Sequence, residues 1–226
     1  MKSSLQFDAI IFDMDGLMFD TERIGLEAFC HAASMHGYKN KEEFFKNLIG
    51  RTVADADRAM KETFGSDFPI TAVRQDRALY ISEIRRTSGI PMKTGLRELL
   101  KYLKKRGIPL GIASSSAHTI VKENLIHAGI QQYFQTYLCG DEIINGKPHP
   151  EIYLKMAKRL SKNPSTCIVL EDSLLGVTAA YTAGMIPIMV PDMQEPTESI
   201  RQIAHRIFPS LHEVRTYLEA MNASEK

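Results

Sequence analysis

The sequence predicts an α/β protein with a doubly wound parallel sheet, interrupted by an inserted all-helical domain. Short apolar runs of strand length alternate with amphipathic helical segments from about residue 90 onward. One more apolar run lies near the N-terminus, whereas the stretch from about 20 to 90 shows only helical patterns. We therefore expect a core of residues 1–19 and 90–226, with residues 20–89 inserted as a helical cap.

The composition is typical of a soluble globular protein. The chain has 226 residues, of which 44% are hydrophobic and 24% charged, and its net charge is +1. This balance gives no bulk attraction to nucleic acid or membranes, so we expect neither as a partner and expect a monomer. No signal-peptide pattern or membrane-length apolar run is visible, which favours a cytoplasmic protein. The three cysteines are widely spaced and predict neither disulfides nor a zinc site, and Cys139 and Cys167 lie in apolar runs as core thiols.

The first strand and the helices of the insert follow from local signals. The apolar run Ala9 to Phe12 predicts a buried strand that ends on Asp13. Thr21 can cap the first inserted helix, and glycines or a proline mark most of the remaining helix ends. The predicted helical segments of the insert are Thr21 to Gly37, Glu42 to Ile49, Thr52 to Phe64 and Pro69 to Ser88.

After residue 90, strands and helices alternate. We expect Thr94 to cap a helix with four leucines on one face, which Gly107 ends. Further helices are expected over about 117–128, from Pro150 onward, over about 174–183 and over about 212–221. The strands expected between them are Pro109 to Ala113, Thr136 to Cys139, Cys167 to Leu170 and Ile186 to Val190. With the first strand, the predicted sheet has five strands.

Two carboxylates follow the first strand. Asp13 lies at its carboxyl end, where open α/β sheets bind ligands, and a carboxylate there can attack an electrophile such as phosphorus. Asp15 is close enough to exchange a proton with a leaving group, and Gly16 lets the chain turn. A strand followed by an ordinary Asp/Gly turn explains the same residues, and this stretch alone does not decide between the two.

Polar residues also follow other predicted strands: Ser114, Lys147, Glu171 and Asp172. The carboxyl ends of parallel strands share one edge, so these residues can converge with Asp13 and perform phosphoryl transfer. Asp13 and Asp172 could hold a divalent cation, since hard oxygen ligands suit Mg²⁺. Lys147 adds positive charge, and Ser114 with backbone N–H groups can hold phosphate oxygens.

Each of these residues also has an ordinary structural explanation. Ser114 to Ser116 could cap the following helix, and Lys147 could be a solvated turn lysine. Glu171-Asp172-Ser173 could form a helix N-cap. For the serines and the lysine, taken one at a time, these explanations are the stronger ones. Together they require four separate coincidences at the strand ends, in the right order and with the right charges.

These four motifs resemble those of the haloacid dehalogenase-like superfamily, in its phosphatase and phosphohexomutase branch with a Rossmann-like core. The first motif is Asp13-Met14-Asp15-Gly16, and the second is Ser114 at the end of a strand. The third is Lys147 in Gly146-Lys147-Pro148-His149-Pro150-Glu151, and the fourth is Leu170-Glu171-Asp172-Ser173-Leu174-Leu175-Gly176. The resemblance covers nearly the whole chain and includes a helical cap inserted after the first motif.

The resemblance implies a role for each motif residue. Asp13 would be the nucleophile that becomes an aspartyl-phosphate, and Asp15 the general acid and base. Mg²⁺ would be bound by the Asp13 carboxylate, the Asp15 backbone carbonyl and Asp172, with Glu171 as a ligand or through water. Ser114, Ser115 and Lys147 would hold the phosphoryl group of a small phosphorylated metabolite.

The inserted helices should select the substrate. Candidate contacts are Glu22 at the hinge and Arg51 in the loop after Gly50, together with Ser116 of the core. Weaker candidates, for which an ordinary place on a helix surface is favoured, are His31, His36, Arg58 and His118.

Three functions remain open at this stage. The first is a Mg²⁺-dependent phosphatase of small metabolites, and the second is a β-phosphoglucomutase-like isomerase. Mutases of that type carry a histidine five residues after the aspartate that corresponds to Asp20 and an arginine three residues after the cap-loop glycine. Here those positions are Gly25 and Val53, which favours hydrolysis, although Arg51 could substitute. The third is a receiver-like phosphoacceptor domain, which the chain length, the position of the carboxylate pair and the cap make the weakest.

Overall fold

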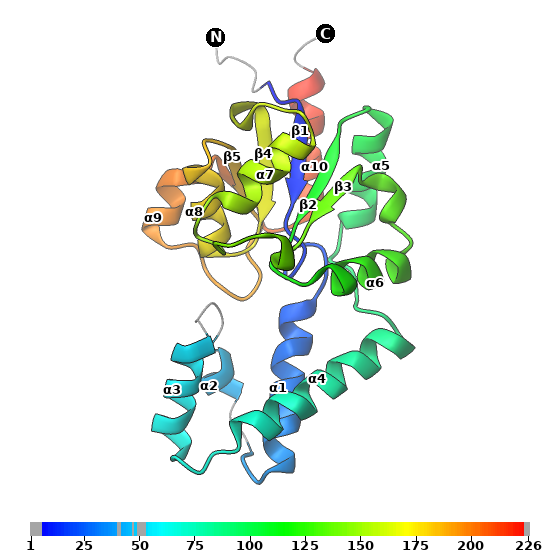
Figure 1. Cartoon of the computed structure of the whole chain (residues 1–226). Coiled ribbons are helices and arrows are strands. Elements are labelled where there is room, and N and C mark those ends of the chain that lie inside the picture. The colour runs from blue at the N-terminus through cyan, green and yellow to red at the C-terminus, as the bar shows by residue number, and fades with distance from the viewer. Residues whose placement is uncertain (1–5, 40–41, 47, 49–52, 224–226) are drawn as a thin grey trace. The chain divides into compact units, whose positions relative to one another are not determined.

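The computed structural model describes residues 6–39, 42–46, 48 and 53–223 (Figure 1). The chain forms two compact units, one of Met1–Asp20 with Pro91–Lys226 and the other of Thr21–Ile90. We call them the α/β unit and the helical unit. No helix among the described residues is long and apolar enough to cross a bilayer.

The α/β unit contains a parallel sheet with the strand order β3-β2-β1-β4-β5-β6. Its strands are β1 (Ala9–Phe12), β2 (Leu110–Ala113), β3 (Thr136–Leu138), β4 (Cys167–Glu171), β5 (Ile186–Met189) and β6 (Arg206–Ile207). The doubly wound fold class is therefore confirmed. The predicted count of five strands is wrong, because β6 has only two residues, too few to show a periodic pattern.

Helices cover both faces of the sheet. In Figure 1, α7 lies in front of the sheet and α10 behind it. The helices of the unit are α5 (Leu96–Lys105), α6 (His118–Ala128), α7 (Glu151–Arg159), α8 (Leu174–Thr182), α9 (Glu198–Ile203) and α10 (Leu211–Ala223). Short 3₁₀ turns are η1 (Gln131–Tyr133), η2 (Gly140–Glu142) and η3 (Pro164–Thr166).

One predicted helix cap is wrong. Thr94 does not cap α5; the N-cap is Gly95, in a left-handed conformation with φ of 88°. A Cβ atom on Gly95 would lie 2.7 Å from the backbone nitrogen of His212, so the close approach of α10 requires glycine.

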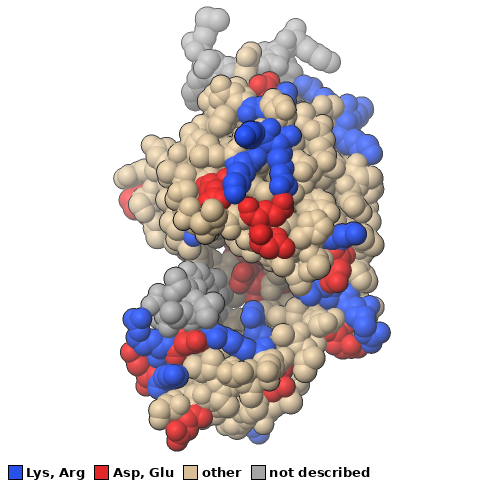
Figure 2. Space-filling model, in the orientation of Figure 1, with Lys and Arg blue, Asp and Glu red and all other residues tan. Residues whose placement is uncertain are grey.

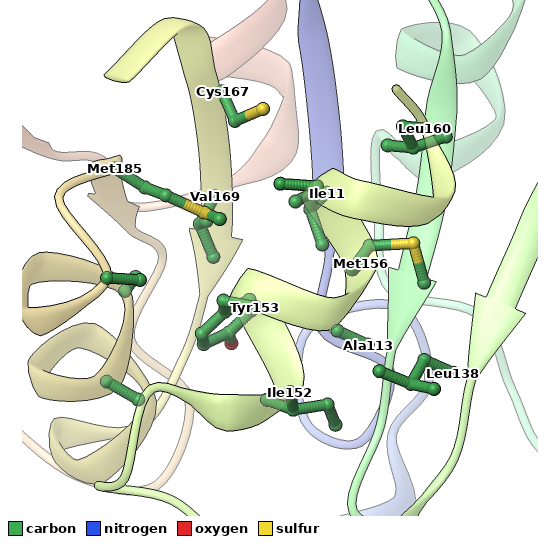
Figure 3. Close-up of a cluster of buried hydrophobic side chains, with 14 of the residues drawn as sticks. Ile11, Ala113, Leu138, Ile152, Tyr153, Met156, Leu160, Cys167, Val169 and Met185 are labelled. Atoms are coloured by element: carbon green, nitrogen blue, oxygen red, sulfur yellow. The ribbon is translucent and has the colours of Figure 1, made fainter. Parts of the chain in front are cut away.

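Strand β1 lies in the middle of the sheet, between β2 and β4. All four of its residues are fully buried, and alternate side chains enter the layers on the two faces of the sheet. On one face, Ile11 joins an apolar cluster with Val169 and the α7 residues Tyr153 and Met156 (Figure 3). Both buried cysteines, Cys139 and Cys167, are core thiols as expected.

The register of β1 decides which residues meet at the carboxyl edge of the sheet. Phe12 pairs with Ile112 of β2 and with Leu170 of β4. The residues that follow these three strands are therefore neighbours, at the point where the strand order reverses.

The helical unit consists of α1 (Thr21–Met35), α2 (Glu42–Lys46), α3 (Val53–Phe64) and α4 (Ile70–Thr87). Its core is aromatic, with Phe68 close to Tyr38 and Phe64. Helix α2 ends at Lys46 and not at Ile49, and Ile49 itself lies outside the described residues.

Charged side chains of both signs lie next to one another on the face of the α/β unit seen in Figure 2. Ion pairs of this unit include Arg159 with Glu142 and Lys155 with Glu151. The pattern agrees with the balanced net charge of +1.

Candidate active site

The loop after β1 is a tight turn. The Asp13 N–H donates to the Leu170 carbonyl at 2.9 Å, which extends the line of β1 by one residue. Gly16 then reverses the chain with φ of 82°. A Cβ atom on Gly16 would overlap the carboxylate of Asp172, 2.8 Å from its Cγ. Position 16 therefore requires glycine for both its backbone conformation and its closeness to Asp172.

Lys147 is not a solvated turn lysine. Its side chain is 8% exposed, and its ammonium group contacts Asp13 Oδ1 and lies 2.5 Å from Glu171 Oε1. Burial alone would lower the pKa of Lys147, but the carboxylates of Asp13 and Glu171 outweigh it and raise that pKa well above its ordinary value. A charged ammonium group therefore lies beside the end of β1.

Glu171 is the last residue of β4, where the sequence predicted it to follow the strand. Its Oε1 accepts hydrogen bonds from Lys147 and from the Tyr153 hydroxyl at 2.8 Å. Its Oε2 accepts from the Ser173 N–H at 2.9 Å and the Ser173 hydroxyl at 3.0 Å. Burial acts to raise the pKa of Glu171, but Lys147 and these donors lower it, so the group is ionised.

The helix-cap explanation of this fourth motif holds for Ser173 only. Ser173 is the N-cap of α8, and its hydroxyl accepts from the Gly176 N–H at 3.0 Å. A Cβ atom on Gly176 would overlap the carboxylate of Glu171, so glycine here makes room for the buried acid.

Asp15 has a different environment. Its Oδ2 accepts hydrogen bonds from the hydroxyls of Ser114 at 3.1 Å and Ser116 at 2.8 Å. The Ser116 N–H donates in turn to the Ser114 hydroxyl at 3.0 Å. The N-cap of α6 is Ala117, with no side-chain cap, so the serines hold Asp15 and the helix-cap explanation is wrong. Ser115, between them, is exposed.

Three buried carboxylates could hold a metal ion. Ligand oxygens of Asp13, Glu171 and Asp172 all lie within 4.8 Å of one another. Burial, the first cause, and the carboxylates of Glu171 and Asp15 raise the pKa of Asp13 well above its usual value, against the effect of Lys147. A divalent cation would offset this negative charge, and carboxylate oxygens suit a hard cation. Each oxygen of Glu171 already accepts two hydrogen bonds, so this carboxylate has less capacity left for a metal ion.

The sequence analysis missed two residues that touch this cluster. Tyr153 lies between apolar residues at helical spacing, a pattern that predicts core, and it is indeed fully buried. Its hydroxyl nevertheless binds Glu171. Ser173 was seen only as a helix cap, although it also holds Glu171.

The candidate residues of the helical unit have partners within that unit or are exposed. Glu22 lies in the first turn of α1, near enough to Arg77 to affect its pKa. His36 binds Asp76 at 2.8 Å, and the His31 ring lies 4.8 Å from that of Tyr80. Arg51 lies outside the described residues.

The remaining two weaker candidates are Arg58 and His118. Arg58 is exposed on α3. In the α/β unit, His118 begins α6, and its backbone N–H donates to Asp141 at 3.2 Å.

Comparison with known proteins identifies relatives over most of the chain. A family model described as haloacid dehalogenase-like hydrolase matches residues 10–190. A phosphorylated carbohydrates phosphatase of Thermotoga maritima is 31% identical over 79% of this chain and 82% of its own length. A probable pseudouridine-5'-phosphatase of Drosophila melanogaster is 34% identical over 85% of this chain and 87% of its own length. The solved structure of a putative β-phosphoglucomutase from Thermotoga maritima is 29% identical with a TM-score of 0.77, over 94% of this chain and 99% of that one.

Proposed function

Because the chain belongs to the haloacid dehalogenase-like hydrolase family, we propose that it is a Mg²⁺-dependent phosphatase of small phosphorylated metabolites. The observation that carries the proposal is the pair of carboxylates after β1. Asp13 contacts an ammonium group, and Asp15 is held by two hydroxyls. The two acids lie two residues apart but have partners suited to opposite roles.

Asp13 is the nucleophile in this proposal. Its carboxylate attacks the phosphorus atom, and the bond to the leaving oxygen breaks as an aspartyl-phosphate forms. The attack requires the ionised carboxylate, which contact with Lys147 favours against the effect of burial on the pKa of Asp13 and which a bound cation would favour further. The Lys147 ammonium group also offsets the negative charge of the phosphoryl oxygens.

Asp15 moves the protons. It gives one to the leaving oxygen and later takes one from the water that attacks the aspartyl-phosphate. Hydroxyl partners suit this change of state, because Ser114 and Ser116 can donate to a carboxylate or accept from a carboxylic acid.

The acidic cluster fits a bound Mg²⁺ ion. Asp13 and Asp172 would hold it with the backbone carbonyl of Asp15, and Glu171 would bind it directly or through a water molecule. When bound, the ion supplies electrophilic stabilisation of the phosphoryl oxygens.

Hydrolysis is favoured over isomerisation by Gly25 of the helical unit, which has no side chain where the mutases carry a histidine. Arg77 of α4 lies against α1 at Gly25, where its Nε donates to the Gly25 carbonyl at 3.2 Å. A Cβ atom at position 25 would lie 2.9 Å from Arg77 Nη2. The end of the flexible Arg77 side chain thus occupies the space in which the mutases carry a histidine.

The test is a screen for Mg²⁺-dependent phosphate release from sugar phosphates, nucleotides, pseudouridine 5'-phosphate and phosphoglycolate. Asp13→Asn should lower the rate by about a thousandfold or more, as expected when a nucleophile is lost. Asp8→Asn is the matched control, because Asp8 is exposed just before the amino end of the same strand. Clear turnover by Asp13→Asn, or full activity in a chelator, would contradict the proposal.

A second assay separates the phosphatase from the mutase. The enzyme is supplied with β-glucose 1-phosphate and a trace of the corresponding bisphosphate, and free phosphate and glucose 6-phosphate are followed together. Phosphate release should be the faster process. Faster formation of glucose 6-phosphate would identify a mutase.

A further inference from the structure

Lys147 depends on its surroundings for its position. It is carried by a loop without regular structure, and its long side chain has much rotamer freedom to lose. Pro148 and Pro150 have no N–H group, so the loop can form few backbone hydrogen bonds of its own. Two residues of the first turn of α7, Glu151 and Tyr153, contact the loop or the partner of Lys147.

Glu151 binds the backbone just before Lys147. Its Oε1 accepts from the Ile144 N–H at 3.0 Å, and its Oε2 accepts from the Asn145 N–H at 2.9 Å. The Asn145 side chain adds a third hydrogen bond at 3.0 Å. Lys155, one turn later in α7, holds the same carboxylate at 2.6 Å. Glu151 therefore binds the start of the loop to helix α7.

Tyr153 acts at the other end of the lysine side chain. The Lys147 ammonium group lies 5.2 Å from the centre of the Tyr153 ring, within the range of a cation–π interaction. The ring is packed in the apolar cluster with Ile152 and Met156, as Figure 3 shows. A phenylalanine could fill this space equally well, so the packing alone does not explain the hydroxyl.

The hydroxyl of Tyr153 has one partner, the oxygen of Glu171 that also binds Lys147. With Ser173 on the other oxygen, four donors hold the Glu171 carboxylate in one orientation. Without the Tyr153 hydroxyl, Oε1 keeps Lys147 as its single described partner, and three donors hold the carboxylate instead of four.

We propose that the first turn of α7 positions Lys147: Glu151 holds the backbone of its loop, and Tyr153 holds its ammonium group through Glu171. Glu151 and Tyr153 are positioning residues, since they act through Lys147. The inference rests on the proposed function for its effect on turnover, but the placement of Lys147 can be measured without turnover.

The test compares Tyr153→Phe with Tyr102→Phe. Tyr102 also donates a hydroxyl hydrogen bond inside the α/β unit, from α5 to the Leu218 carbonyl at 3.2 Å, and α5 carries no proposed site residue. A second pair is Glu151→Gln with Glu213→Gln, since Glu213 is also a first-turn glutamate and accepts from Ser210. Each pair controls for the stability lost with one hydrogen-bonding group.

Three readouts are taken on the full chain. They are kcat and KM with p-nitrophenyl phosphate, the Kd of Mg²⁺ by calorimetry, and the rate at which acetic anhydride labels Lys147, followed by mass spectrometry. Tyr153→Phe and Glu151→Gln should lower kcat about tenfold, the effect of losing a hydrogen bond to a charged group, with KM and the Kd of Mg²⁺ nearly unchanged. Labelling of Lys147 should become faster in both variants and in neither control.

The outcomes separate the two proposals. If the wild-type protein releases phosphate from no phosphomonoester, the proposed function fails, and the labelling rates still decide whether α7 positions Lys147. If Lys147 is labelled at the wild-type rate in Tyr153→Phe and Glu151→Gln, the positioning role is wrong whatever the activity. A large loss of Mg²⁺ affinity in Tyr153→Phe would also overturn it, because it would assign Glu171 to the metal and not to Lys147.

Discussion

The substitution Gly16→Ala tests the proposed metal site with a single methyl group. Position 16 has φ of 82°, where a residue with a Cβ atom is strained by about 1–2 kcal/mol. For a chain of this size, that strain corresponds to a fall in Tm of about 2–8 °C. The new Cβ atom would also lie 2.8 Å from Asp172 Cγ, inside the ordinary contact distance of 3.4 Å. Asp172 Oδ2 would lie closer still, so the carboxylate would have to retreat by roughly one ångström to restore an ordinary contact.

Such a retreat matters for magnesium. Mg²⁺ demands near-ideal octahedral geometry, so a displaced ligand weakens binding. We expect the Kd of Mg²⁺ to rise about 10- to 100-fold, the range seen when groups that orient a metal ligand are disturbed. Phosphate release at limiting Mg²⁺ should fall by a similar factor, and high Mg²⁺ should restore part of it.

Gly107→Ala is the matched control. Gly107 also has a positive φ, 68°, but a Cβ atom there would meet nothing within 4 Å. Both variants should lose Tm through backbone strain, Gly16→Ala the more because of the overlap with Asp172, while only Gly16→Ala loses Mg²⁺ affinity in calorimetry. If the two variants bind Mg²⁺ equally well, Asp172 is not a ligand whose position matters, and the proposed site is wrong.

Three further predictions concern proton transfer, thiol reactivity and acid stability. With p-nitrophenyl phosphate, whose leaving group needs little protonation, Asp15→Asn should release a burst of about one nitrophenolate per chain in stopped-flow absorbance. Turnover should then nearly stop, because no base remains to activate the water that attacks the aspartyl-phosphate. Steady turnover would contradict the proposed role of Asp15. Burial raises the pKa of Cys139 to about 12 and that of Cys167 to about 11, so iodoacetamide at pH 8 should label no more than one thiol per native chain and all three in denaturant, counted by mass spectrometry. Burial and Arg206 lower the pKa of His205 below its unfolded value of about 6.5, so the folded state is favoured while this histidine is neutral. This contribution to stability is lost as the pH falls through and below about 6.5. The free energy of unfolding of His205→Gln, measured in urea, should therefore fall less between pH 7.5 and 5 than that of the wild type, and equal losses would contradict this.

The sequence was sufficient to predict most of the fold and the convergence of the site. A parallel strand that is covered on both faces of its sheet is apolar throughout, so an unbroken apolar run predicts it. The bounds of β1, β2, β4 and β5 were therefore predicted to within a residue. A polar residue that follows such a strand must lie at the carboxyl edge, which is why Asp13, Ser114 and Glu171 could be placed together. Only the order of the motifs made Lys147 convincing, since nothing in Asn145-Gly146-Lys147 itself predicts burial.

The residues that sequence reasoning missed, or assigned to another role, are those whose contacts lie far away in the sequence. Tyr153 has the spacing of a core residue, and only the structure brings its hydroxyl to Glu171, 18 positions away. Ser116 was assigned to the substrate or to a helix cap, whereas its hydroxyl lies 2.8 Å from Asp15, 101 positions away. Gly25 has no functional group, and only the structure shows that the Arg77 side chain occupies the space beside it.

The strand order explains how two carboxylates two residues apart come to have different partners. Strand β1 lies between β4 and β2, so each side of its carboxyl end faces a different set of residues. Asp13 still follows the line of the strand, bonded to Leu170 of β4, and contacts Lys147. After the turn at Gly16 begins, Asp15 binds the serines that follow β2. The position of each acid along the turn therefore decides its partner: Asp13, still in line with β1, contacts Lys147 from the loop after β3, whereas Asp15, two residues later, reaches the two hydroxyls that follow β2.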